Sequence, residues 1–190
     1  MIVLLICSAL SPARAEEVAA DSSGQDVRNQ PVENAQSASL MPEREQELID
    51  LFLRARKRYV SGKPGTFAKD VRLDMQVELF RFMKAGQDVQ DWVGTVKGHG
   101  TTPEGDTWLV IEIADGITLG TWKARANDAV EQTLLHPFSP LHKLAAKATM
   151  GEPVIFSGRI IASMNDTDDA MISRPQLIAR FKDLRIDKSR

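Results

Sequence analysis

The order of β-strand signals in the second half of the chain restricts its fold more than any other feature of the sequence. Short runs rich in β-branched and aromatic residues recur from Trp92 onward, and each is bounded by residues that favour turns. The clearest run, Thr107–Ile113, is followed by Asp115-Gly116, a dipeptide typical of a two-residue hairpin turn. The predicted strands are Trp92–Lys97, Thr107–Ile113, Ile117–Lys123, Val154–Ile161 and Leu177–Ile186, with Val130–Leu135 as an additional strand.

A short helix is predicted between the third and the fourth of the main strands. Ser139 suits the N-cap and Pro140 the first helical position, while Gly151 would stop the helix. Three strands, a helix and two strands are the order of elements in an OB-fold, a barrel that binds oligomers on the face of its second and third strands. We therefore expect an α+β protein with a small antiparallel OB-like β-barrel at 89–190, and a fragment of a β-sandwich is the alternative.

The residues ahead of the barrel, 42–88, predict a helical lead-in. Pro42 suits a first helical position, and the apolar residues that follow have the spacing of one helical face: Leu48, Leu51, Phe52, Ala55 and Tyr59. The stretch Thr66–Lys84 is ambiguous, because its apolar residues alternate as in a strand and also share one helical face. We expect a second helix antiparallel to the first, and a strand remains the alternative.

Residues 1–15 have the pattern of a cleavable secretion signal. Ile2–Leu10 is apolar, Pro12 breaks it, and Ala13-Arg14-Ala15 offers small residues for cleavage after Ala15, although no basic residue precedes the apolar run. The run is too short for a membrane span, which takes about 20 apolar residues. Residues 16–41 are polar and predict a flexible tether. Cleavage would remove Cys7, the only cysteine, so we expect an exported, periplasmic or secreted protein without disulfides or thiol chemistry.

Several short motifs spread over Trp92–Ile186 resemble those of a family of uncharacterised bacterial proteins, often exported, that have a barrel-like domain after a helical lead-in. The motifs are Trp92-Val93-Gly94, Gly120-Thr121-Trp122, Thr133-Leu134-Leu135, Ser139-Pro140-Leu141, Gly151–Gly158, Pro175-Gln176-Leu177 and Arg180–Leu184. The resemblance covers about half of the chain. It implies the OB-like barrel and export, and it assigns no activity. The loop near Asn165–Met171 departs from the family in being more acidic.

No motif in the sequence commits the chain to a reaction. The three histidines, His99, His136 and His142, lack the spacing of a zinc pair, and the acidic loop Asn165–Asp169 lacks the glycine and the glutamate of a calcium loop. Phe156-Ser157-Gly158 lies within a predicted strand and is not a nucleophile elbow. We therefore predict no catalytic residue, no metal site and no cofactor.

Tryptophan and lysine residues are the best candidates for ligand binding. Alternate residues of a strand share a face, so Trp108 and Glu112 lie together, and the charge of Glu112 marks that face as the outer one. Trp108 beside Lys97 or Lys123 would form an aromatic and cationic platform suited to stacking. The candidate ligand-binding residues are Trp108, Trp122, Lys97, Lys123 and His99. In the alternative interpretation all three tryptophans fill the core.

These observations favour an exported, non-catalytic binding or assembly module that recognises a protein, peptide or glycan partner in the cell envelope. A single-stranded nucleic-acid-binding OB protein of an uptake or conjugation system is the alternative. The formal net charge of −2 disfavours it, because nucleic-acid binders normally carry a basic excess. An envelope hydrolase is the second alternative, since acidic residues are plentiful but no catalytic pair stands out.

Overall fold

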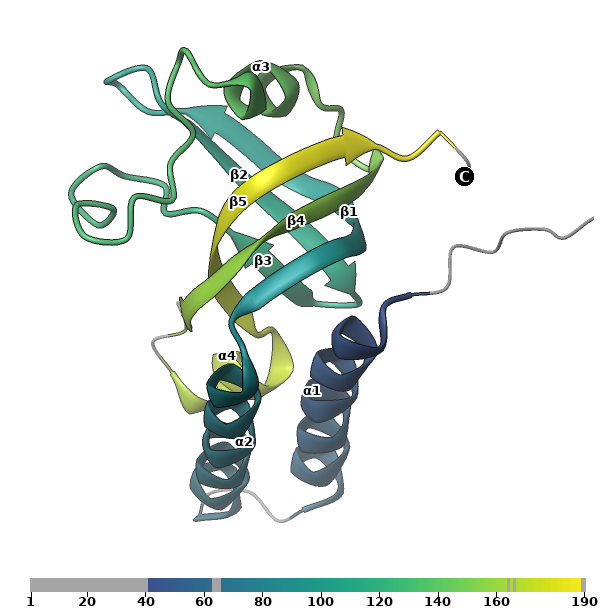
Figure 1. Cartoon of the computed structure of the whole chain (residues 1–190). Coiled ribbons are helices and arrows are strands. Elements are labelled where there is room, and N and C mark those ends of the chain that lie inside the picture. Colours follow the sequence, from purple (N-terminus) through teal and green to yellow (C-terminus); the bar gives the residue numbers. More distant parts are fainter. Residues whose placement is uncertain (1–40, 63–65, 164, 166, 189–190) are drawn as a thin grey trace, which may run out of the picture. The chain divides into compact units, whose positions relative to one another are not determined.

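A computed structural model describes residues 41–62, 66–163, 165 and 167–188, and five strands within them form a closed barrel (Figure 1). The elements are α1 (Glu43–Ser61), α2 (Thr66–Ala85), β1 (Asp88–Thr101), β2 (Thr107–Ala114), β3 (Ile117–Gly120), α3 (Pro140–Lys147), β4 (Pro153–Ser163), α4 (Asp168–Ser173) and β5 (Gln176–Ile186). The predicted signal at 1–15 and, except for Met41, the predicted tether at 16–41 lie outside the described residues.

The strands close in the order β1-β2-β3-β5-β4, with β4 pairing back onto β1. All pairings are antiparallel except that of β3 with β5, where Leu119 lies opposite Leu177 in a parallel register. The hairpin between β2 and β3 turns at Asp115-Gly116, and Gly116 takes the positive φ of 69° that such a tight turn requires. The predicted α+β class, with helices ahead of an OB-like barrel and a helix before its last two strands, is confirmed.

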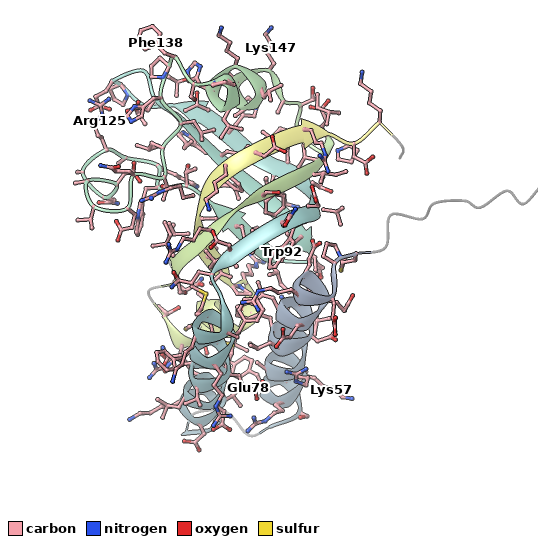
Figure 2. All side chains as sticks on the ribbon, in the orientation of Figure 1. Lys57, Glu78, Trp92, Arg125, Phe138 and Lys147 are labelled. Atoms are coloured by element: carbon pink, nitrogen blue, oxygen red, sulfur yellow. The ribbon has the colours of Figure 1, made fainter. Side chains whose placement is uncertain are left out.

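Helices α1 and α2 lie side by side beneath one end of the barrel, with α4 next to them and α3 at the other end (Figure 1). The predicted stripe of α1 is buried from Leu48 to Ala55. The ambiguous stretch is helical, and Val71 and Phe82 are among the α2 residues that face the core. Trp92 of β1 is only 1% exposed and lies between the barrel and the helices (Figure 2).

A buried carboxylate joins α1 to the barrel. Glu45, in the first turn of α1, is completely buried and accepts the backbone N–H of Val93 through both oxygens, at 3.0 and 3.2 Å. The N–H needs this partner because β1 is irregular there: Asp91 has a φ of 53°, and the register with β4 shifts between Val89 and Trp92. Glu45 therefore satisfies a strand irregularity and also lies where the helix dipole favours negative charge.

The predicted strand at Val130–Leu135 is wrong. In the structure this stretch forms turns, and only Leu135 makes an isolated bridge, to Thr107. The buried carboxylate of Asp128 accepts the hydroxyl of Thr133 at 2.7 Å and the N–H of Leu134 at 3.0 Å. A side chain that bonds the backbone locally in this way competes with a strand ladder, which is why the β-prone residues do not form one.

Several boundaries also differ from expectation. The third predicted strand, Ile117–Lys123, ends at Gly120, and the first begins before Trp92, at Asp88. Ser139 caps α3 as predicted, but the helix ends at Lys147, and Gly151 instead occupies the turn before β4, with a φ of 83°. The segment Ala162–Pro175, which its polar composition predicted to be an irregular loop, contains α4, whose Ile172 is fully buried.

Candidate ligand-binding groove

A groove of about 500 Å³ crosses the outer face of the barrel. Its lining comes from β1, β2, β3, the turn between β2 and β3, the segment after β3, and the residues that precede and begin β5. We call it the Trp108 groove and define it by these residues: Lys97, Gly98, Trp108, Val110, Glu112, Asp115, Gly116, Thr118, Gly120, Lys123, Arg174, Gln176 and Leu177. Along β2 the even-numbered residues Trp108, Val110 and Glu112 are half-buried while their neighbours are buried, so they occupy the outer face as predicted.

Two glycines of β1 hold the indole of Trp108 flat against the backbone. Gly100 lies opposite Trp108 in the strand register, and Gly98 lies opposite Val110. A Cβ atom on Gly100 would lie 2.7 Å from indole Cε2, and one on Gly98 would lie 3.2 Å from indole Cζ3. Any side chain at Gly100 would therefore displace the ring. Because Gly98 and Gly100 carry no side chains, the indole can pack directly against the backbone of β1.

Charged side chains surround the indole. Nζ of Lys97 lies 2.8 Å from Oε2 of Glu112, and the other oxygen of Glu112 accepts the N–H of Gly116 at 3.1 Å. Glu112 thus ties Lys97 to the tight turn between β2 and β3. Nζ of Lys123 lies 5.1 Å from the centroid of the Trp108 ring, which is the distance of a cation–π contact. Neither Lys123 nor Arg174 makes an ion pair with another residue that the structure describes, so both present free positive charge to the groove.

The Lys97 ammonium holds the pKa of Glu112 below its usual range, mainly through their hydrogen bond, and the Gly116 N–H adds to the effect against partial desolvation. The Glu112 side chain is 20% exposed, so it remains in contact with solvent. A carboxyl group whose folded pKa is depressed stabilises the fold fully above its unfolded pKa, about 4.3 for glutamate. This stabilisation is lost as pH falls through the lower, folded value.

Replacement of Lys97 by methionine is expected to raise the pKa of Glu112 towards the ordinary glutamate value, because the hydrogen-bonding cation is gone while the side chain keeps its length. A ¹³C NMR titration of the side-chain carboxyl carbons measures this directly. Equal midpoints for Glu112 in the wild type and in Lys97→Met would contradict the assigned pairing.

The structure brings together three of the five predicted ligand-binding residues: Lys97, Trp108 and Lys123 line one groove. His99 does not line it, since it alternates with Gly98 and Gly100 along β1 and lies opposite Leu109. Trp122 does not line it either. It lies in the long segment after β3, where its backbone N–H donates to Oγ1 of Thr133.

Sequence reasoning missed the groove residues that precede and begin β5, Arg174 and Gln176. They reach the groove because β5 pairs in parallel with β3, so that Gln176 lies opposite Thr118. No local pattern in the sequence predicts a pairing between segments so far apart. The only available signal was the OB-like order of strands, which implies that the last strand lies beside the third.

A second polar cluster lies outside the groove, at the loop between β1 and β2. Asp106 is fully buried, and its carboxylate lies 2.9 Å from Nδ1 of His136 and 2.9 Å from Nε of Arg125. These contacts fasten the long segment between β3 and α3 to the barrel. Among the residues described, no group of three or more His, Cys, Asp or Glu side chains could hold a metal ion, and no helix is long and apolar enough to cross a membrane.

Comparison of the chain with protein-family models and with curated proteins gave no match. The resemblance to exported barrel proteins therefore stays a prediction from the quoted motifs. The fold and the groove by themselves define the class of the molecule: an OB-like barrel, preceded by a helical hairpin, with an aromatic and cationic groove on its outer face.

Proposed function

We propose that this protein is a non-catalytic binding module that is exported to the cell envelope and takes a peptide or glycan segment of an envelope partner into the Trp108 groove. The observation that carries the proposal is the meeting of Trp108, Lys97 and Lys123 from separate segments of the chain in one groove. The pattern of residues 1–15 supports export. The groove lies over β2 and β3, the strands whose face OB-folds use for oligomers.

The groove favours a ligand that combines a flat or ring-shaped face with negative charge. The indole offers a rigid apolar surface for stacking, and the nearby ammonium of Lys123 is free to pair with an anionic group. Arg174 adds a second cation, while Asp115 and Gln176 offer acceptors and donors at the rim. A strand of acidic sugars or a peptide with alternating aromatic and acidic side chains has this chemistry.

The state of Glu112 supports binding over hydrolysis. A general acid needs a carboxyl group whose pKa is raised towards neutrality. The pKa of Glu112 is instead lowered by Lys97, and both carboxylate oxygens are engaged in hydrogen bonds within the groove wall. Glu112 therefore acts as a structural brace between Lys97 and the turn, with no free oxygen directed to a reacting group.

Truncation of Trp108 to alanine is expected to weaken ligand binding at least tenfold, because a buried aromatic anchor typically contributes about 2 kcal/mol or more. Isothermal titration calorimetry with a panel of acidic oligosaccharides and acidic peptides measures the effect. Phe138→Ala is the matched control, since Phe138 is 96% exposed and points away from the barrel outside the groove (Figure 2). Equal affinities for wild type and Trp108→Ala would overturn the assignment of the groove.

A single-stranded oligonucleotide belongs in the same panel, because stacking on Trp108 beside cations also suits bases. Binding of the oligonucleotide alone, with an affinity that falls steeply as salt rises, would replace the envelope-partner proposal by the nucleic-acid alternative. Binding of acidic oligosaccharides or peptides, with little response to the oligonucleotide, supports the proposal as stated.

A further inference from the structure

Helix α2 carries a second apolar stripe that no described residue covers. Leu73, Val77 and Phe80 are 44%, 50% and 68% exposed, and their spacing of four and three residues aligns them along one side of the helix. The opposite side of α2 supplies the core residues Val71, Met75, Leu79 and Phe82. A helix inside a small domain needs only one buried side, so a second apolar stripe marks an interaction surface.

Charged residues extend this stripe at both ends with the same spacing. Asp70 precedes Leu73 by three residues, and Lys84 follows Phe80 by four, so the series 70, 73, 77, 80 and 84 follows a heptad pattern. Both residues are exposed, and neither makes an ion pair with another described residue. Among the other charged residues of α2, Arg72 pairs with Asp168, Asp74 with Arg58 and Glu78 with Arg54. Lys69 and Arg81 make no ion pair with a described residue.

A hollow lies beside the stripe. A groove of about 580 Å³ runs between α2 and β4, rimmed by Phe80 and lined by apolar side chains that include Leu79, Met83, Ile160 and Met171. Phe80 therefore stands as a ridge next to an apolar hollow. A surface that carries a ridge and a hollow side by side can be complementary to itself when two copies meet about a twofold axis.

We propose that two copies of this chain pair through α2 in an antiparallel arrangement about a twofold axis. In this arrangement Val77 of one copy packs on Phe80 of the other. Lys84 of each copy lies over Leu73 of the other and within a helical turn of its Asp70. Antiparallel pairing brings opposite charges together at both ends of the stripe, whereas parallel pairing would set Asp70 against Asp70 and Lys84 against Lys84.

The stripe shares no residue with the Trp108 groove, so the proposed dimer leaves the Trp108 groove of each copy free. A dimer with two open grooves binds a repetitive partner with an avidity above the affinity of either groove. The dimer proposal does not depend on the identity of the ligand, and its test requires none.

Sedimentation velocity of the full chain over a wide concentration range tests the pairing. The wild type is expected to shift from monomer to dimer with concentration. Val77→Glu is expected to weaken the dimer at least tenfold, because it sets a charge at the centre of the stripe. Val60→Glu is the matched control: Val60 is an exposed valine of α1, 79% accessible, and its substitution should leave the dimer unchanged. Circular dichroism confirms that both variants remain folded.

A charge exchange tests the antiparallel orientation. Asp70→Lys alone and Lys84→Asp alone should each weaken the dimer, because each sets like charges against each other at both ends. The double variant Asp70→Lys/Lys84→Asp should recover wild-type association. A wild type that stays monomeric at every concentration overturns the proposal, and so does a dimer that Val77→Glu leaves intact. A dimer that both single charge variants leave unchanged overturns the orientation.

Discussion

Gly158→Ala is expected to lower the free energy of unfolding by about 3 kcal/mol, a large share of the 5–15 kcal/mol typical of a folded domain. Gly158 lies on β4 where the register with β5 shifts. A Cβ atom there would lie 2.4 Å from the carbonyl oxygen of Arg180 and 3.1 Å from Cα of Phe181. Both atoms belong to the backbone of β5, so relief of the clash requires the two strands to move apart.

Urea unfolding followed by tryptophan fluorescence measures this change. Gly98→Ala is the matched control, because the added Cβ meets only the ring of Trp108, with Cζ3 at 3.2 Å and Cη2 at 3.6 Å, and this ring lies on the outer face. We expect Gly98→Ala to cost less than about 1 kcal/mol, since an exposed side chain can shift where a paired strand cannot. Equal unfolding midpoints for the two variants would show that β4 and β5 do not approach each other as closely at Gly158 as described.

Glu45→Ala is expected to destabilise the protein by about 3 kcal/mol, because it removes a charged acceptor and leaves the buried N–H of Val93 unpaired. Chemical denaturation of Glu45→Ala beside Glu47→Ala separates this effect from the general loss of a glutamate in the first turns of α1. Glu47 is exposed, so its substitution should change stability by no more than about 0.5 kcal/mol.

Glu45→Gln gives a second, graded measurement. The amide oxygen still accepts a hydrogen bond but carries no charge, so we expect a loss between those of Glu47→Ala and Glu45→Ala. Hydrogen exchange at the Val93 amide reports the same contact locally and should accelerate in both Glu45 variants. Unchanged protection of this amide in Glu45→Ala would contradict the role of Glu45 as the link between α1 and β1.

Much of the fold could be predicted from local patterns. The hairpin between β2 and β3 follows from Asp115-Gly116 between two β-prone runs, and the cap of α3 follows from Ser139 before Pro140. The outer face of β2, and the place of Trp108 on it, follow from alternation alone. Local patterns failed at Val130–Leu135, where the hydrogen bonds of the Asp128 carboxylate prevail over strand propensity.

The residues of the candidate groove likewise include some that local patterns predict and some that only distant contacts determine. Lys97, Trp108 and Lys123 could be named because strands β1 to β3 follow one another in the chain and pair as neighbours. The packing of Trp108 on Gly98 and Gly100 could not be predicted, because it depends on the register that places Gly100 opposite Trp108. His99 was predicted for the groove but does not line it. A shift of one residue along a strand moves a side chain to the opposite face of the sheet.

The sequence by itself determined the class of the fold, the order of the five barrel strands and of α3, and the presence of Trp108 and nearby lysines on the outer face of the barrel. These features depend on residues near one another in the chain, whose periodicity and turn chemistry act locally. The tertiary structure alone decided that Arg174 and Gln176 line the groove where β5 pairs with β3, and that Glu45 reaches the irregularity of β1. Contacts between distant segments depend on how buried surfaces fit together, and a linear pattern does not record that fit.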